Sequence, residues 1–280
     1  MNEGRARPFT SPKESDTMFD IHDSAEFLHS ARVQRRALDS IPPKLIPESI
    51  DIGYQVQDAM VKRLCISERT SPGGYKIALT NPVAQTMLGI PHPVYGRLLR
   101  SRLLKDRAVI AAKDYVSRIV EAEFAFEIAL GVPASHIPYT ASSIKDYIGA
   151  VHPAIEIADN RLPTLNDVSA QILAADNAIH GCLVLGEPVE DWQDIDLATT
   201  GVTLEVNEKK MRTGTGKNVL DHPLNALAWL ADILPDYGLG LSPGNYVTTG
   251  LATDSPYEAQ AGDRLRATFE GLGEVSMRFE

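Results

Sequence analysis

The sequence predicts an α+β fold, in which a β-rich core carries helices at its edges. After residue 70, most of the chain consists of short apolar runs of extended character. These runs are spaced too irregularly for repeated βαβ units, and the sequence contains no internal repeat. With 280 residues, of which 44% are hydrophobic, the chain can bury one large core.

The first 50 residues are expected to precede the main domain. Residues 1–22 contain no apolar stretch and are predicted to form a flexible tail. In SAEFLHSARVQRRAL, from Ser24, apolar residues recur at roughly helical spacing, and the basic residues between them are expected on a solvated face. Three prolines in IPPKLIPES then indicate a linker. We therefore divide the chain into a tail (1–22), a helical segment with its linker (23–50) and a main domain (51–280).

The main domain opens with a helix over about Ile52 to Ser67, followed by a turn over residues 71–74. Strands are predicted over YKIALT (75–80) and over the runs 118–128, 152–159, 182–186, 202–206, 245–252, 263–271 and 274–280. Two helices interrupt them, over residues 167–179 and 222–234. For the second helix, Asp221 is predicted as the N-terminal cap, since Pro223 follows it and Gly238 lies beyond the end.

Composition excludes several classes of protein. The net charge is −10 and there is no long basic run, so a nucleic-acid partner is not expected. No apolar run approaches the roughly 20 residues that span a bilayer, so no membrane partner is expected. Cys65 and Cys182 sit in apolar contexts outside any CxxC pair, which favours reduced thiols in a cytoplasmic protein.

The run VEAEFAFEI places two glutamates inside an apolar strand. Side chains alternate in a strand, so Glu121 and Glu123 share one face, about 7 Å apart, while Phe124 points into the core. Two carboxylates this close repel unless the face is wet or a cation lies between them. An exposed edge strand with solvated glutamates is the alternative interpretation.

A third glutamate, Glu156, lies in the apolar run HPAIEIAD. Three carboxylates without an accompanying His or Cys favour Mg²⁺ or Mn²⁺ over zinc. An octahedral ion with three protein oxygens keeps three positions open, which could take a bidentate 2-oxo acid and one water.

The chain resembles the fumarylacetoacetate hydrolase superfamily, in its branch of 2-keto-4-pentenoate hydratases and 4-oxalocrotonate decarboxylases. The resemblance runs from about residue 45 to the C-terminus. It rests on GYKIALT (74–80), VEAEFAF (120–126), PAIEIADNR (153–161), AADNA (174–178), HPLNALAWLA (222–231), SPGNYVTTG (242–250) and GDRLRATFEGLGEVSMRF (262–279). It implies a mixed β-roll core with peripheral helices, and a catalytic role for the domain of residues 51–280.

The resemblance also implies site residues. Metal binding, to Mg²⁺ or Mn²⁺, is expected from Glu121, Glu123 and Glu156. The resemblance implies that Lys76 is catalytic. From its position alone, a lysine in mid-strand loses hydration unless it meets an anion, such as a substrate carboxylate or the glutamates. The alternative is a lysine that extends from a strand edge into water. Three further residues, His92, His180 and Thr249, are expected to bind the substrate.

Two positions depart from the hydratase pattern. Ser101 stands where an acidic residue is expected, and Ile179 where a serine is expected after ADNA. Both changes affect water addition more than they affect binding of a keto acid. The resemblance implies a hydratase-like lyase of aromatic compound catabolism, acting on a short unsaturated 2-oxo acid. A decarboxylase or isomerase is the first alternative, and a catalytically silent partner subunit is the second. A homo-oligomer, dimer or larger, is also expected, because the run 245–252 and the helix over residues 222–234 carry more apolar surface than one small domain needs, and the resemblance implies the same.

Overall fold

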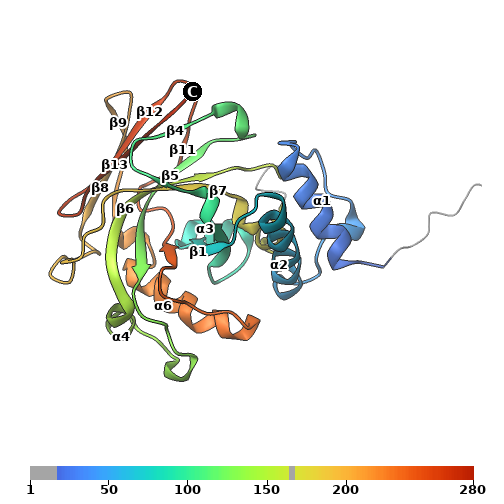
Figure 1. Cartoon of the computed structure of the whole chain (residues 1–280), viewed down its shortest axis with the longest axis horizontal. Coiled ribbons are helices and arrows are strands. Elements are labelled where there is room, and N and C mark those ends of the chain that lie inside the picture. Colours follow the sequence, from blue (N-terminus) through green and yellow to red (C-terminus); the bar gives the residue numbers. More distant parts are fainter. Residues whose placement is uncertain (1–17, 164–167) are drawn as a thin grey trace, which may run out of the picture.

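The structure is a computed structural model that describes residues 18–163 and 168–280 (Figure 1). The helices are α1 (Ile21–Val33), α2 (Ile50–Ser67), α3 (Pro82–Leu88), α4 (Ala141–Ile144), α5 (Ala170–Ala175) and α6 (Pro223–Ile233). The strands are β1 (Pro72–Ala78), β2 (Val94–Leu99), β3 (Leu103–Lys105), β4 (Ala108–Ile110), β5 (Ile119–Ile128), β6 (Ile148–Ala158), β7 (His180–Leu185), β8 (Gly201–Val206), β9 (Lys209–Thr215), β10 (Tyr246–Thr248), β11 (Tyr257–Glu258), β12 (Arg264–Phe269) and β13 (Gly273–Phe279).

Within the described residues, the strands form two sheets. The larger has eight strands in the order β2-β1-β10-β5-β6-β7-β3, with β11 paired to β5. The smaller has five, in the order β4-β13-β12-β8-β9. Most neighbours are antiparallel, but β1 with β10, β3 with β7 and β4 with β13 are parallel. The predicted α+β class with a mixed β core is confirmed.

The main core lies between the two sheets. Ala122, Phe124 and Phe126 of β5 are fully buried there, as strand alternation predicted. The ring of Phe124 meets that of Phe269 from β12 edge-on, with 5.0 Å between the centroids. Because β5 pairs with β10 on one side and β6 on the other, the edge-strand interpretation of Glu121 and Glu123 is wrong.

The larger sheet curls until its two ends approach each other. Its first strand, β2, lies beside β7, and a short turn, Arg100–Arg102, links β2 to β3 at the opposite end of the strand order. Small and medium apolar side chains fill the inside of this curl, namely Leu98, Ala125, Ala154 and Leu183. The face that carries the glutamates is therefore an enclosed inner face.

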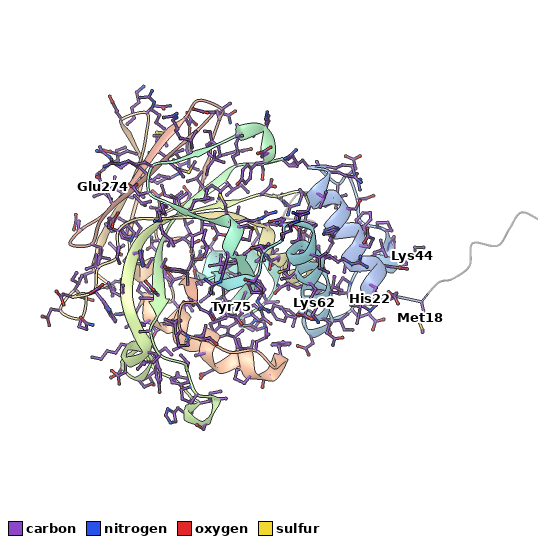
Figure 2. All side chains as sticks on the ribbon, in the orientation of Figure 1. Met18, His22, Lys44, Lys62, Tyr75 and Glu274 are labelled. Atoms are coloured by element: carbon purple, nitrogen blue, oxygen red, sulfur yellow. The ribbon has the colours of Figure 1, made fainter. Side chains whose placement is uncertain are left out.

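Helices α1, α2 and α5 form a layer against one side of the larger sheet. Leu28, Met60 and Ile172, one from each helix, belong to a single buried cluster. Figures 1 and 2 show α1 and α2 on the side of the molecule away from the smaller sheet, with His22 and Lys62 opposite Glu274. None of the described helices is both long and apolar enough to cross a membrane.

Some local predictions need correction. Residues 1–17 of the predicted tail lie outside the described residues, and α1 already begins at Ile21. The turn predicted over residues 71–74 is wrong, since β1 begins at Pro72. Gly74 allows this because a Cβ there would lie 1.8 Å from the carbonyl oxygen of Tyr246 on β10. The division at residues 50/51 stays a prediction.

Helices α5 and α6 also differ from the predicted helices at their ends. The N-terminal cap of α6 is His222, whose Nδ1 accepts a hydrogen bond from the Leu224 amide at 3.1 Å, so the prediction of Asp221 is wrong. The helix predicted over residues 167–179 is shorter, because α5 ends at Ala175 and a left-handed turn follows. Helix α3 and strand β2 were not predicted, because asparagine, proline and glycine signals in that segment indicate a loop.

Candidate metal centre

The three glutamates meet at one point on the inner face of the curled sheet. Glu121 of β5 stands directly opposite Glu156 of β6, and Glu123 lies two residues further along the same face. One carboxylate oxygen from each residue lies within 4.8 Å of the others. Glu123 and Glu156 are fully buried, and Glu121 is half-buried. The convergence expected from the strand pattern is present.

Each of the two buried glutamates has one oxygen already bonded and one without a partner. Oε1 of Glu156 accepts from Nζ of Lys76 at 3.0 Å and lies 2.8 Å from Nδ1 of His180. Oε2 of Glu123 accepts from the amide of Gly250 at 2.7 Å. The other oxygens, Oε2 of Glu156 and Oε1 of Glu123, are buried without a hydrogen-bond partner among the described residues. Buried oxygens left free in this way fit a bound cation.

The electrostatics of the cluster favour either a bound cation or a proton kept on one carboxyl group. Burial, then the charges of Glu156 and Glu121, raises the pKa of Glu123 well above its usual range. Burial also raises the pKa of Glu121. The pKa of Glu156 is lowered, because the charge of Lys76 and the hydrogen bond from His180 outweigh its burial. Three ionised carboxylates are thus unfavourable here unless more positive charge than one lysine is present.

Lys76 is buried, and its ammonium group has two bonding partners. Besides Glu156, its Nζ donates to the carbonyl oxygen of Ala178 at 3.1 Å. Burial alone would lower the pKa of Lys76, but the three carboxylates outweigh burial and raise it. Its side chain is only 2% exposed, so the alternative of a lysine reaching water from a strand edge is wrong.

His180 contacts the cluster directly. Burial lowers the pKa of its ring, which favours the neutral form, although Glu156 opposes this effect. With its proton on Nδ1, facing Glu156, the ring keeps a free lone pair on Nε2. That Nε2 atom is buried and has no hydrogen-bond partner among the described residues. His180 can therefore orient Glu156 with one nitrogen and accept a proton or a hydrogen bond with the other.

The threonine that faces the cluster is the neighbour of the one expected. The Thr249 hydroxyl donates to the Phe124 carbonyl at 3.2 Å, inside the backbone of β5. Thr248 is in register with Lys76 on β1 and with Ala125 on β5, so its side chain shares their face. The buried Thr248 hydroxyl has no partner among the described residues, which makes it the freer polar group.

Two other residues singled out in the sequence lie apart from the carboxylates. His92 is bonded through Nδ1 to the carbonyl of Pro93. Ser101 is exposed and donates to Glu68 at 3.1 Å. Across the described part of the chain, neither has a hydrogen bond or ion pair with the cluster. Ile179, in contrast, is nearly buried in the turn that covers Lys76.

Three residues that support the cluster were missed in the sequence. Gly250 and Asn177 fall inside SPGNYVTTG and AADNA, so those motifs located them without assigning a role. Arg32 was expected on a solvated face, but its side chain is only 4% exposed and lies against residues 176 and 180. No pattern distinguishes Arg32 from its basic neighbours, because its partners are about 145 positions away.

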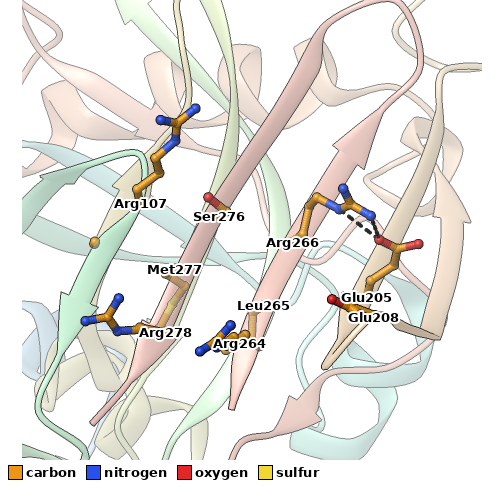
Figure 3. Close-up of a pocket in the computed structure, with 10 residues that line it drawn as sticks. Arg107, Glu205, Glu208, Arg264, Leu265, Arg266, Ser276, Met277 and Arg278 are labelled. Carbon is orange, nitrogen blue, oxygen red and sulfur yellow. Dashed lines mark hydrogen bonds and ion pairs between the residues drawn. The ribbon is translucent and has the colours of Figure 1, made fainter. Parts of the chain in front are cut away.

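A pocket elsewhere has different chemistry. About 610 Å³ in volume, it lies on the outer face of the smaller sheet and is lined by Arg107, Arg264, Arg266, Arg278 and Glu205, among others (Figure 3). These arginines are exposed, and Arg266 is paired with Glu205. The pocket is a solvated charged surface. At the carboxylates, in contrast, Glu123, Glu156 and His180 each keep a buried polar atom without a partner among the described residues.

Comparison with known proteins agrees with this geometry. The family model of the fumarylacetoacetate (FAA) hydrolase C-terminal domain matches residues 89–280. The chain is 31% identical over 256 residues to 2-keto-4-pentenoate hydratase 1 of Dechloromonas aromatica (strain RCB). The match covers 91% of this chain and 95% of that protein. It is also 31% identical over 208 residues to a 4-oxalocrotonate decarboxylase of Pseudomonas putida, covering 74% of this chain and 76% of that protein.

A solved structure extends the likeness to the whole fold. The 4-oxalocrotonate decarboxylase of Pseudomonas putida G7, complexed with magnesium and adipate, superposes with a TM-score of 0.84. The match covers 93% of this chain and 97% of that one, at 26% identity. A second structure of that enzyme, complexed with calcium and acetate, gives a TM-score of 0.82. The chain therefore belongs to the fumarylacetoacetate hydrolase family.

Proposed function

We propose that this chain is a divalent-metal-dependent lyase that adds water to a short unsaturated 2-oxo acid, or to its 2-hydroxydienoic form. The observation that carries the proposal is the set of free, buried carboxylate oxygens on Glu123 and Glu156, next to Lys76. The hydratases and decarboxylases among its relatives support the same class of substrate. We also propose that the protein acts in the breakdown of aromatic compounds, in the cytoplasm.

Glu121, Glu123 and Glu156 would hold Mg²⁺, or Mn²⁺, through oxygens that such hard cations prefer. When bound, the ion would supply Lewis-acid stabilisation of negative charge that develops on a 2-oxo oxygen. Magnesium is our first choice, because a related structure is complexed with it.

The protein's own groups divide the remaining work. Lys76 carries a proton on Nζ and can offer it, or a hydrogen bond, to the substrate carboxylate. The free Nε2 of His180 can accept a proton from a water or a substrate hydroxyl, while its Nδ1 keeps Glu156 in place. The Thr248 hydroxyl is a further candidate for contact with the substrate, in preference to Thr249. We keep His92 only as a weaker candidate, given its local contact.

A second function, decarboxylation, is favoured by the superposition on the magnesium complex of a decarboxylase. The test is to incubate the purified protein and Mg²⁺ with a 2-hydroxydienoate and, separately, with an unsaturated 2-oxo diacid. Hydration of the dienoate without release of carbon dioxide is the expected result. Release of carbon dioxide from the diacid, without hydration, would assign the decarboxylase, and a simple double-bond shift would assign an isomerase. No reaction with either substrate would favour the alternative of a catalytically silent partner subunit.

A further inference from the structure

The segment that covers the carboxylates has an unusual backbone. Asn177, Ala178 and Ile179 all have left-handed φ angles, of 58°, 47° and 51°. A left-handed residue other than glycine is strained, and a β-branched isoleucine is among the least suited to this conformation. A run of this kind persists only if its surroundings hold it.

This left-handed turn sets the position of two groups at the cluster. Its Ala178 carbonyl receives the hydrogen bond from Lys76 Nζ at 3.1 Å. The next residue, His180, places Nδ1 2.8 Å from Oε1 of Glu156. Since His180 directly follows the turn, the shape of the turn sets where the His180 ring meets Glu156.

Two sets of side-chain bonds, one from Asn177 and one from Asp176, hold the turn. The Asn177 side chain accepts from the Arg97 amide at 2.6 Å and donates to the Arg97 carbonyl at 2.9 Å, which ties the turn to β2. Asp176 is bonded to Arg161 at 2.8 Å, and Arg161 is bonded in turn to Asp159 at 2.7 Å. All of these contacts come from the part of the chain that follows α2.

Among the described residues of α1, Arg32 makes the hydrogen bonds to the turn. Its Nη1 donates to the carbonyl of His180, and its Nη2 donates to the carbonyl of Asp176 at 2.9 Å, so one guanidinium joins the residues on either side of the turn. Nη2 also lies 3.4 Å from the Asp176 carboxylate. Together with Arg161 and Asp159, the buried group contains two cations and two anions. This balance makes a buried arginine tolerable, and the planar fork suits two acceptors.

We propose that Arg32 is a positioning residue for the metal centre. By fixing the carbonyls on both sides of the left-handed turn, it holds Ala178 against Lys76 and His180 against Glu156. Helix α1 lies before residue 89, where the family match begins, so this contribution comes from outside the matched region. The inference rests on the proposed function, because it assumes that Glu156 binds a metal ion.

The test measures Mn²⁺ affinity and turnover in Arg32→Ala, Arg32→Lys and the control Arg63→Ala. Arg63 also links α1 to α2, through Glu26 at 2.6 Å, but its ion pair is on the surface. Arg32→Ala should weaken Mn²⁺ binding by about 10-fold or more, the usual effect of losing a residue that orients a ligand. Low concentrations of free guanidinium should restore part of the affinity by refilling the cavity. The Mn²⁺ affinity of Arg32→Lys should lie between those of the wild type and Arg32→Ala, because one ammonium group cannot bond to both carbonyls.

Several outcomes separate this inference from the proposed function. Wild-type Mn²⁺ affinity and turnover in Arg32→Ala would overturn the role of Arg32 and leave the proposed function intact. Equal losses in Arg32→Ala and Arg63→Ala, with no effect of guanidinium, would show that α1 acts only on stability, and would also overturn it. If Arg32→Ala does not fold, the Mn²⁺ affinity of Arg32→Lys is the deciding measurement. An affinity equal to that of the wild type would overturn the proposal, because a lysine cannot bond to both carbonyls. A wild-type protein that binds no Mn²⁺ would overturn both.

Discussion

Single hydrogen bonds decide which carboxylate oxygens are available at the centre. Glu123 can offer Oε1 because the Gly250 amide holds Oε2 at 2.7 Å. Gly250 is tightly constrained, since its φ is 94° and a Cβ there would lie 2.1 Å from the Thr80 hydroxyl oxygen. Gly250 therefore allows the left-handed backbone at this position and also holds Glu123 so that Oε1 stays available.

Replacing this glycine should separate the two effects. Gly250→Ala is expected to lower stability and to weaken metal binding, because Thr80 must move and the amide bond to Glu123 is displaced. The control is Gly244→Ala, which has a similar φ of 76° but open space around its Cβ. Both variants carry the backbone strain of about 1–2 kcal/mol, measured by denaturant unfolding. Calorimetric titration with Mg²⁺ should show a loss only for Gly250→Ala, and equal affinities would contradict the account.

Lys76 is expected to serve chemistry more than metal binding. Lys76→Met should lower kcat by about 10²-fold or more, in the range of general acid–base groups. Metal affinity should stay unchanged or increase, because a neighbouring positive charge is removed from the carboxylates. Lys105→Met, at an exposed lysine of β3, provides the control in the same kinetic assay. Loss of metal binding together with activity in Lys76→Met would instead make Lys76 a support for the site.

At the scale of elements, the sequence predicted the strands that carry the chemistry. Alternation in β5 placed Glu121 and Glu123 on one face and Phe124 in the core, because a strand buried on both faces obeys the two-residue period strictly. The sequence predicts that a helix continues through Asn177, where the structure has a left-handed turn. Its conformation depends on distant partners such as Arg32, which local propensity cannot reveal.

The segment around Ser101 shows another limit of prediction from sequence. Motif position suggested that Ser101 stands at the site, but the turn between β2 and β3 carries it to an exposed place beside Glu68. The departure at Ile179 is the one that lies on the turn next to Lys76. A sequence motif gives order along the chain, while the curl of the sheet decides which residues meet.

The end of α2 gives a prediction about pH. Burial would raise the pKa of Glu68, but hydrogen bonds and charge from Arg102 outweigh it and lower this pKa. A lowered folded-state pKa means that the pair stabilises above the unfolded pKa, about 4.3, and that this stability is lost as pH falls through the folded value. Glu68→Gln should therefore reduce the free energy of unfolding by about 1–2 kcal/mol at pH 7, and by progressively less below about pH 4.

Denaturant unfolding from pH 7 down to acid measures this difference. Glu26→Gln is the control, because the Glu26–Arg63 pair is exposed and should contribute little at any pH. A gap between wild type and Glu68→Gln that stays constant over the pH range would argue against the Glu68–Arg102 pair as its source.

At the scale of the whole molecule, we expect several copies of the chain to assemble. The sequence suggested that β10 and α6 carry surplus apolar surface, but Val247, Leu227 and Leu230 are fully buried within the single chain. The expectation of a homo-oligomer now rests on the family resemblance alone. Light scattering at micromolar concentration should give at least a dimer, and a monomer under these conditions would refute this expectation.

The whole fold brings two strands, a covering turn and an N-terminal helix around one group of carboxylates. We expect this group of carboxylates to bind a divalent ion on which turnover depends. The most direct measurement compares wild type and Glu123→Gln with a 2-hydroxydienoate, after removal of metal by a chelator and after addition of Mg²⁺. We expect no turnover without metal, recovery with Mg²⁺ in the wild type, and no recovery in Glu123→Gln. Turnover that survives chelation, or an active Glu123→Gln variant, would contradict the account.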